Sequence, residues 1–391
     1  MACIDLDLAH SYKPNPQQDS DYALLPLKMR FEDGGAYALL GPSGCGKTSL
    51  LNIISGLVTP SQGSVTFDGV LMNSKTPQQR NIAQVFQFPV IYDTMTVAEN
   101  LAFPLRNRGV AVDKIAQRVG KIAEMLELSG QLDVRAAGLA ADAKQKISLG
   151  RGLVREDVSA VLFDEPLTVI DPHLKWQLRR KLKQIHHELK LTLVYVTHDQ
   201  VEALTFADQV VVMTRGRAVQ IGSASDLFER PQHTFVGHFI GSPGMNFLPA
   251  ERSGDGLTVA GCAVAADRVV PAASGRLLLG IRPEYVTLAA PHAPGAVPAT
   301  VLQAQDIGTY WLITAQVGPG VAGATGAAGA TGAAGSAAAA GPTTVRARLS
   351  PDANIPAAGA AVWLAVLGSH TCFYADDVLI GEIPEPQKVS T

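Results

Sequence analysis

The chain has 391 residues, which at about 150 residues per domain predicts two or three domains. Lys and Arg total 32 against 35 Asp and Glu, and the formal charge of −3 argues against a protein that holds nucleic acid through a basic surface. A hydrophobic content of 47% excludes a largely disordered chain.

Targeting and redox signals are weak throughout the sequence. The most apolar stretch, Ile355–Leu367, is too short for a membrane span of about 18 residues and contains Pro356. The acidic start MACIDLDLAH has no basic segment followed by an apolar one, so no signal peptide is expected. The cysteines lie far apart without a C-x-x-C pair, which predicts a reduced, cytosolic protein without disulfides or a zinc site.

Residues 1–235 are predicted to alternate strands and helices around a buried parallel sheet. Four short apolar runs suit central strands buried on both faces: Ala36–Leu40, Ala160–Phe163, Leu191–Val196 and Gln209–Met213. Between about 88 and 155, apolar residues recur at helical spacing, as at Ile115, Val119 and Ile122. A mostly helical subdomain is therefore expected to be inserted there.

Residues 236–391 are predicted to form a separate all-β domain, a small barrel or sandwich. Gly, Pro and Ala become frequent, and short alternating runs appear at Leu257–Val264, Arg276–Leu288, Ala299–Gln305, Trp311–Val317, Thr343–Leu349 and Val362–Leu367. The segment 318–341 is almost entirely Ala, Gly, Thr and Ser, which predicts a flexible loop between two strands.

A phosphate-binding loop follows the first apolar run. The sequence Gly41-Pro42-Ser43-Gly44-Cys45-Gly46-Lys47-Thr48 matches G-x-x-x-x-G-K-[ST] and precedes the helical stretch that begins at Ser49. Its glycines allow successive backbone N–H groups to point at phosphate oxygens, and the helix N-terminus adds positive potential. Lys47 would reach the β- and γ-phosphates, and the Thr48 hydroxyl would ligate Mg²⁺. Cys45 is either an alkylatable thiol or, as we favour, a tolerated small side chain.

A second acidic motif ends the run Ala160–Phe163. Asp164 is placed to hold Mg²⁺ through water, and Glu165 is placed to polarise an attacking water molecule. An acidic turn after a core strand would be the plain alternative, but the phosphate loop in the same chain argues against it.

Together these motifs resemble the ATPase subunits of ABC importers of the maltose, sugar and polyol type. The resemblance covers nearly the whole chain and implies an α/β P-loop NTPase domain with an inserted helical subdomain, followed by a C-terminal all-β OB-type domain. It implies that Gln87 contacts Mg²⁺ and the lytic water, that His198 contacts the γ-phosphate, and that Asp171 in the segment Val169–Asp171 lies at a dimer face. It also implies that Tyr12 stacks on adenine. In the C-terminal region, the stretch 241–248 and Arg282-Pro283-Glu284 match the OB-type domain.

One segment departs from the family. The signature L-S-G-G-Q reads Leu139-Ala140-Ala141-Asp142-Ala143 here, so the serine hydroxyl and both glycines are missing. In this family the signature completes the ATP site of the opposite subunit, and the charge of Asp142 near a γ-phosphate would cost on the order of 3 kcal/mol. We therefore expect a second, paralogous ATPase subunit with an intact signature; a homodimer whose loop adapts is the alternative.

The resemblance also implies two membrane permease subunits, a periplasmic solute-binding protein as an indirect partner, and a peripheral position on the cytoplasmic face of the inner membrane. Exposed apolar residues in Phe88–Tyr92 would dock the permease, or else pack within the subdomain. The segment Ala141–Arg155, together with the overall pattern, resembles the ATPase subunit of glycerol importers more than those of maltose or sn-glycerol-3-phosphate importers, which makes glycerol the expected solute.

Two further readings stay open. A soluble ABC-type ATPase could act on nucleic acid or ribosomes through the OB-type domain. Against it, that domain lacks a basic stripe, and its aromatic residues are expected to be mainly core: Tyr285, Tyr310, Trp311, Trp363, Phe373 and Tyr374. The C-terminal domain could also be regulatory, binding a signalling protein or a metabolite.

Overall fold

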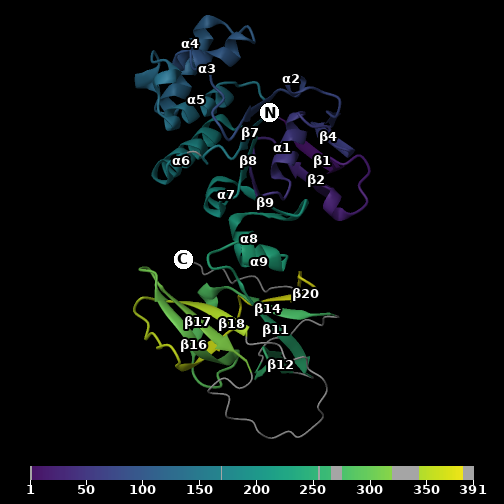
Figure 1. The fold of residues 1–391 in the computed structure, drawn as a ribbon, viewed down its shortest axis with the longest axis vertical. Helices are drawn as coiled ribbons and strands as arrows, with labels where there is room; N and C mark the ends of the chain where they lie inside the picture. Colours follow the sequence, from purple (N-terminus) through teal and green to yellow (C-terminus); the bar gives the residue numbers. More distant parts are fainter. Residues whose placement is uncertain (1, 169, 254–255, 266–274, 319–342, 382–391) are drawn as a thin grey trace. The chain divides into compact units, whose positions relative to one another are not determined.

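The structure is a computed structural model that describes residues 2–168, 170–253, 256–265, 275–318 and 343–381 (Figure 1). It forms two compact units, Met1–Ala224 and Ser225–Thr391. The sequence analysis places the boundary after residue 235. Helix α8 (Ala224–Glu229) and the start of α9 (Thr234–Phe239) therefore belong with the second unit rather than the first.

A six-stranded sheet is the centre of the first unit. Its strand order is β10-β9-β3-β8-β7-β6, and every neighbouring pair is parallel except the antiparallel pair β9 and β10. Strands β3 and β8 are buried along their whole length, as their apolar runs predict. The strands are β3 (Ala36–Leu40), β6 (Ile82–Val85), β7 (Ala160–Asp164), β8 (Leu193–Thr197), β9 (Gln209–Thr214) and β10 (Arg217–Gly222).

A second sheet in this unit is antiparallel and was not predicted. It has the order β2-β1-β4-β5, with β1 at Ile4–His10, β2 at Leu24–Phe31, β4 at Gln62–Phe67 and β5 at Val70–Leu71. Burial in β2 largely alternates, so one face joins the core. That core also contains the buried residues of helix α1 (Lys47–Ser55), among them Leu50 and Ile53.

The inserted subdomain is helical, as expected. It contains α3 (Val97–Arg106), α4 (Val112–Met125) and α5 (Ala141–Leu153), which lie together in Figure 1. Gly150 lets α3 and α5 approach, because a Cβ there would lie 2.5 Å from the Leu101 side chain. The other helices of this unit are α2 (Pro77–Arg80), α6 (Pro172–Leu189) and α7 (Gln200–Phe206). In the described part of the chain, no helix has both the length and the apolar character to span a bilayer.

The second unit contains two antiparallel sheets that enclose one core. Their orders are β13-β12-β11-β14-β20-β21 and β15-β19-β16-β17-β18. The strands are β11 (Asn246–Ser253), β12 (Gly256–Val259), β13 (Cys262–Val264), β14 (Leu277–Ile281), β15 (Thr287–Ala289), β16 (Ala296–Asp306), β17 (Trp311–Val317), β18 (Thr343–Leu349), β19 (Ala361–Ala365), β20 (Cys372–Ala375) and β21 (Val378–Ile380).

Several details of this unit differ from the sequence analysis. The run Leu257–Val264 is a hairpin whose turn holds Ala260 at φ 48°, and Arg276–Leu288 contains two strands separated by a short 3₁₀ helix. Strands β11, β20 and β21 were not predicted. Apart from Gly318, the expected loop 318–341 lies outside the described residues. Among the aromatic residues expected in the core, only Phe373 and Tyr374 are buried; the other four are half-buried, and Tyr310 lies under the Arg348 guanidinium at 3.8 Å.

A buried arginine joins α8 and α9 to strand β14. Arg282 is 1% exposed and donates hydrogen bonds to the carbonyl oxygens of Leu227, Phe228, Gly237 and Ile240. Its guanidinium also lies 4.1 Å from the centre of the Phe228 ring. A buried charge is tolerable only when its donors are satisfied, and here backbone carbonyls satisfy them.

Candidate nucleotide site

Four neighbouring strands bring the motif residues to one edge of the central sheet. Register pairs Leu40 of β3 with Thr197 of β8, Val196 with Asp164 of β7, and Phe163 with Val85 of β6. These strands are parallel, so their carboxyl ends share an edge, which is where open α/β sheets bind ligands. The phosphate loop, His198, the Asp164–Glu165 pair and Gln87 each follow one of these ends.

The phosphate loop needs glycine at two positions for steric reasons. Gly46 has φ 103° and caps α1, and a Cβ there would lie 2.5 Å from the Ala23 carbonyl oxygen. A Cβ on Gly41 would lie 2.2 Å from the Met213 carbonyl oxygen. Any larger residue would push the loop away from the neighbouring strands.

Lys47 is folded into its own loop. Lys47 is only 5% exposed. Its Nζ donates hydrogen bonds to the carbonyl oxygens of Gly41 at 2.8 Å and Pro42 at 3.0 Å. Cys45 Sγ lies 3.8 Å from the same ammonium. Burial nevertheless raises the pKa of the Cys45 thiol, which keeps it protonated and supports the interpretation of Cys45 as a small packing residue.

The acidic pair lies against the loop. Thr48 Oγ1 donates to Asp164 Oδ1 at 3.3 Å, and burial raises the pKa of the Asp164 carboxyl above its ordinary value. Glu165 adopts the left-handed conformation with φ 46°, and its Oε2 lies 3.1 Å from His198 Nδ1. Thr168 Oγ1 also donates to Glu165 Oε2, at 3.3 Å. These contacts join three of the predicted motifs.

The oxygen donors at this edge fit a magnesium ion. Mg²⁺ prefers oxygen ligands and usually takes one or two protein groups together with water and substrate phosphates. Thr48 and Asp164 supply such a hydroxyl and carboxylate within hydrogen-bonding distance. Among the described residues no group of three His, Cys, Asp or Glu side chains forms a metal cluster, so phosphate and water would complete the coordination. Gln87 is half-buried, two residues beyond the end of β6.

Tyr12 and Asp171 occupy different surroundings. The Tyr12 ring is 64% exposed, and its hydroxyl lies 3.1 Å from Ser49 Oγ in the first turn of α1. This contact brings Tyr12 to the phosphate loop. Asp171 caps α6 by accepting a hydrogen bond from the His173 N–H at 2.9 Å, a local role that is compatible with a position at a dimer face. Val169 of the same predicted segment lies outside the described residues.

Two supporting residues were missed by the sequence analysis. Glu202 is 5% exposed in α7 and accepts hydrogen bonds from Thr197 Oγ1 at 2.7 Å and from Tyr195 Oη at 3.0 Å, which fixes the strand end before His198. Gln145 of α5 donates to the Pro166 carbonyl oxygen at 2.6 Å and so links the helical subdomain to the segment after Glu165. The spacing of Glu202, four residues after His198 at a helix start, was the available signal.

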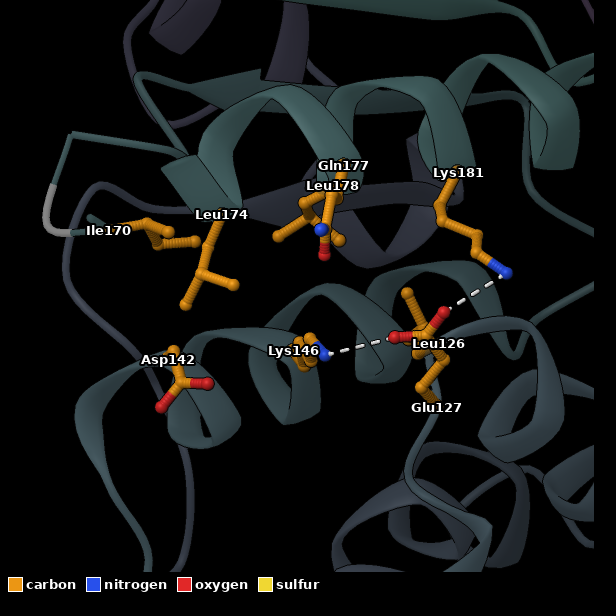
Figure 2. Close-up of a pocket in the computed structure, with 9 residues that line it drawn as sticks. All are labelled: Leu126, Glu127, Asp142, Lys146, Ile170, Leu174, Gln177, Leu178 and Lys181. Carbon is orange, nitrogen blue, oxygen red and sulfur yellow. Dashed lines mark ion pairs between the residues drawn. The ribbon is translucent and has the colours of Figure 1, made fainter. Parts of the chain in front are cut away.

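The altered signature segment begins helix α5. Ala140 caps this helix without a side-chain hydrogen bond, and Asp142 lies in its first turn. A shallow pocket lies beside it and is lined by residues of α5, α6, the loop after α4 and Ile170 before α6, none from the phosphate loop (Figure 2). At its other end, Glu127 lies between Lys146 and Lys181, with N–O distances of 3.7 and 3.2 Å. These ion pairs lower the pKa of Glu127 and connect α5 with α6.

The segment after β6 exposes apolar side chains. Phe86, Phe88, Val90 and Tyr92 are 40%, 68%, 53% and 41% exposed. The side chain of Asn100 fixes the backbone of this segment, because it exchanges two hydrogen bonds with the main chain of Tyr92, at 2.8 and 2.9 Å. The Arg151 guanidinium lies 4.6 Å from the Tyr92 ring centre. We call residues 86–92 the exposed segment below.

Comparisons with known proteins identify the family of this chain. Residues 24–168 match the ABC transporter family model, and residues 241–286 match the MalK OB fold domain. The chain is 44% identical over 270 residues to the sn-glycerol-3-phosphate import ATP-binding protein UgpC of Cereibacter sphaeroides, covering 69% of this chain and 76% of that protein. It is 43% identical to the trehalose import ATP-binding protein SugC of Mycobacterium tuberculosis, covering 74% of each.

A solved structure supports the same assignment. CbiO1 of Clostridium perfringens, part of the ABC transporter complex CbiONQ, superposes with a TM-score of 0.53 at 25% identity, covering 58% of this chain and 90% of that one. None of these comparisons supports the expected paralogous ATPase partner. The chain belongs to the ATP-binding subunits of ABC importers that carry a MalK-type OB domain, and it is an ATPase.

Proposed function

We propose that this ATPase energises an importer for a small polyol or sugar, with ATP held at the carboxyl edge of the central sheet. The observation that carries the proposal is the convergence there of Thr48 on Asp164 and of His198 on Glu165. Relatives named for sn-glycerol-3-phosphate and trehalose import support this solute class. The resemblance of Ala141–Arg155 to glycerol importers, noted from the sequence, makes glycerol the first solute to test.

We assign the site residues the following roles in ATP binding and hydrolysis. Backbone N–H groups of Gly41–Ser49, Pro42 excepted, and the ammonium of Lys47 bind the triphosphate, and Tyr12 stacks on the adenine. Thr48, Asp164 and Gln87 would hold Mg²⁺, which would neutralise charge on the β- and γ-phosphates. Glu165 orients and polarises the attacking water, while His198 donates to the γ-phosphate. Catalysis is then positioning and charge stabilisation, without a covalent intermediate.

Energy transfer requires partners in the membrane. We propose that the exposed segment 86–92 docks one of the transporter's two permease subunits, which places this chain peripherally on the cytoplasmic face of the inner membrane. Four exposed apolar side chains, on a backbone that Asn100 fixes by hydrogen bonds, suit such a contact. A periplasmic binding protein would deliver the solute from the other side.

ATP would bind between two ATPase subunits, with Asp171 near their contact. The altered segment Leu139–Ala143 is the reason to ask whether the second subunit is another copy or a paralogue. Measuring ATPase activity of this chain with its permeases, with and without a co-expressed paralogue, decides the composition. Full activity of the chain alone means a homodimer.

Solute uptake tests the proposed function. A strain lacking this protein, complemented with the wild type, should accumulate labelled glycerol, and complementation with Lys47→Ala should not. Labelled sn-glycerol-3-phosphate and trehalose measured in parallel separate the solutes. Absence of uptake for all three in the wild-type strain would contradict the proposed solute class.

A further inference from the structure

His10 is a buried histidine whose ring nitrogens have no hydrogen-bond partner within the described residues. It ends strand β1, is 5% exposed, and neither Nδ1 nor Nε2 is bonded. Burial lowers the pKa of this imidazole, so the ring is neutral at pH 7 and packs as an apolar group. A phenylalanine would fill such a place without the cost of two unbonded nitrogens, so the His10 ring acts here through its shape and packing rather than through hydrogen bonds.

The His10 and Tyr12 rings make an edge-to-face contact. The ring centroids are 4.5 Å apart and the planes are inclined by 87°. Tyr12 is 64% exposed, so few other groups hold its ring. Its hydroxyl is tied to Ser49 at 3.1 Å, and its following residue is fixed because Lys13 N–H donates to Ser11 Oγ at 3.0 Å.

The backbone of His10 is also connected to the phosphate loop. Its carbonyl oxygen accepts a hydrogen bond from the Ala23 N–H at 2.9 Å. The Ala23 carbonyl is the atom that a Cβ on Gly46 would strike. His10 is therefore bonded to the same residue, Ala23, against which Gly46 of the phosphate loop packs. Its ring also contacts the exposed ring of Tyr12.

We propose that His10 is a positioning residue for base recognition: it holds the Tyr12 ring in the orientation that stacks on the adenine, and it has no part in holding the phosphates. This inference rests on the proposed role of Tyr12 as the base platform. A ring that is already held loses less freedom when a base stacks on it, and such a contact between aromatic rings contributes about 0.5–1.5 kcal/mol.

The test compares ligands with and without a base. Titration calorimetry on the full chain with Mg²⁺ measures the Kd of ATP and of tripolyphosphate for wild type, His10→Ala, His10→Phe and Tyr12→Ala. We expect His10→Ala to weaken ATP binding about threefold to tenfold and to leave tripolyphosphate binding unchanged. His10→Phe should bind ATP within twofold of wild type and melt at a higher temperature. In the assembled transporter, His10→Ala should raise KM for ATP without changing kcat.

Other outcomes are distinguishable. Equal weakening of ATP and tripolyphosphate by His10→Ala, or no weakening of either, would overturn the inference. If Tyr12→Ala also fails to separate the two ligands, the proposed role of Tyr12 is wrong as well. His186→Ala is the matched control, because His186 is a buried histidine of the same unit on α6, bonded to the Leu191 carbonyl, and should change neither affinity.

Discussion

His198 Nδ1 lies 3.1 Å from Glu165 Oε2, although the two residues follow different strands. Strands β8 and β7 are parallel neighbours, and the Glu165 N–H donates to the Val196 carbonyl oxygen at 3.0 Å. The residue that would polarise water and the residue that would hold the γ-phosphate are therefore kept close together by the pairing of β7 with β8 and by their own side-chain contact.

Glu165→Gln should separate ATP binding from hydrolysis. The amide keeps the size of the side chain but cannot polarise water, so turnover of the assembled transporter should fall by about 100-fold or more. The Kd for ATP, measured by calorimetry, should stay within threefold of wild type. Glu188→Gln, an exposed carboxylate on α6, is the control and should retain full turnover. Residual turnover above a tenth of wild type would mean that another group activates the water.

Glu202→Ala should destabilise the first unit. It leaves the buried hydroxyls of Tyr195 and Thr197 without their acceptor, which should cost about 2–4 kcal/mol in the free energy of unfolding, measured with urea. Turnover should also fall, because Thr197 precedes His198. Glu202→Gln keeps an acceptor oxygen and should lose less than half as much stability. Equal losses for the two variants would show that the carboxylate charge, rather than the hydrogen bonds, is what matters.

His186 should make the stability depend on pH. Its imidazole Nδ1 lies 2.9 Å from the Leu191 carbonyl oxygen, and burial lowers its pKa more than the Asp208 carboxylate at 3.8 Å raises it. The unfolded chain therefore binds more protons near pH 6, so this contribution is complete above about pH 6.5 and is lost as pH falls through the lowered pKa. The wild-type Tm should decrease between pH 7 and pH 5.

His186→Gln is the corresponding variant. Its Tm should decrease less steeply over the same pH range, since glutamine does not titrate. Some slope should remain, because the pKa of His10 is also lowered by burial. Parallel melting curves for the two proteins by scanning calorimetry would contradict the assignment to His186.

Asp142→Asn should raise ATPase activity in the assembled transporter while lowering stability slightly. Removing a charge about 5 Å from a phosphate at an effective dielectric near 20 relieves on the order of 3 kcal/mol. The same carboxylate stabilises the first turn of α5 by about 0.3–1 kcal/mol. A lower KM for ATP together with a lower Tm is the expected pair of results. Asp133→Asn, an exposed residue of the same subdomain, should change neither.

The sequence was most informative where structure depends on neighbours along the chain. The phosphate loop, the Asp164–Glu165 pair and the apolar strands before them are local patterns, and the structure places them as predicted. The antiparallel sheet formed by β1, β2, β4 and β5 was missed because its pairing joins segments far apart, such as Ile4 with Phe67. Glu202 was missed for a related reason, since its value depends on two hydroxyls that only the folded strand presents.

Arg282 also determines where the second unit can be separated from the first. A fragment starting at residue 236, the boundary suggested by the sequence, would lack Leu227 and Phe228, and with them two carbonyl acceptors and the ring beneath the guanidinium. That fragment would retain a cation in its interior without two of its four hydrogen bonds. A piece beginning at Ser225 would keep the full set, and it is the version to express for work on this unit in isolation.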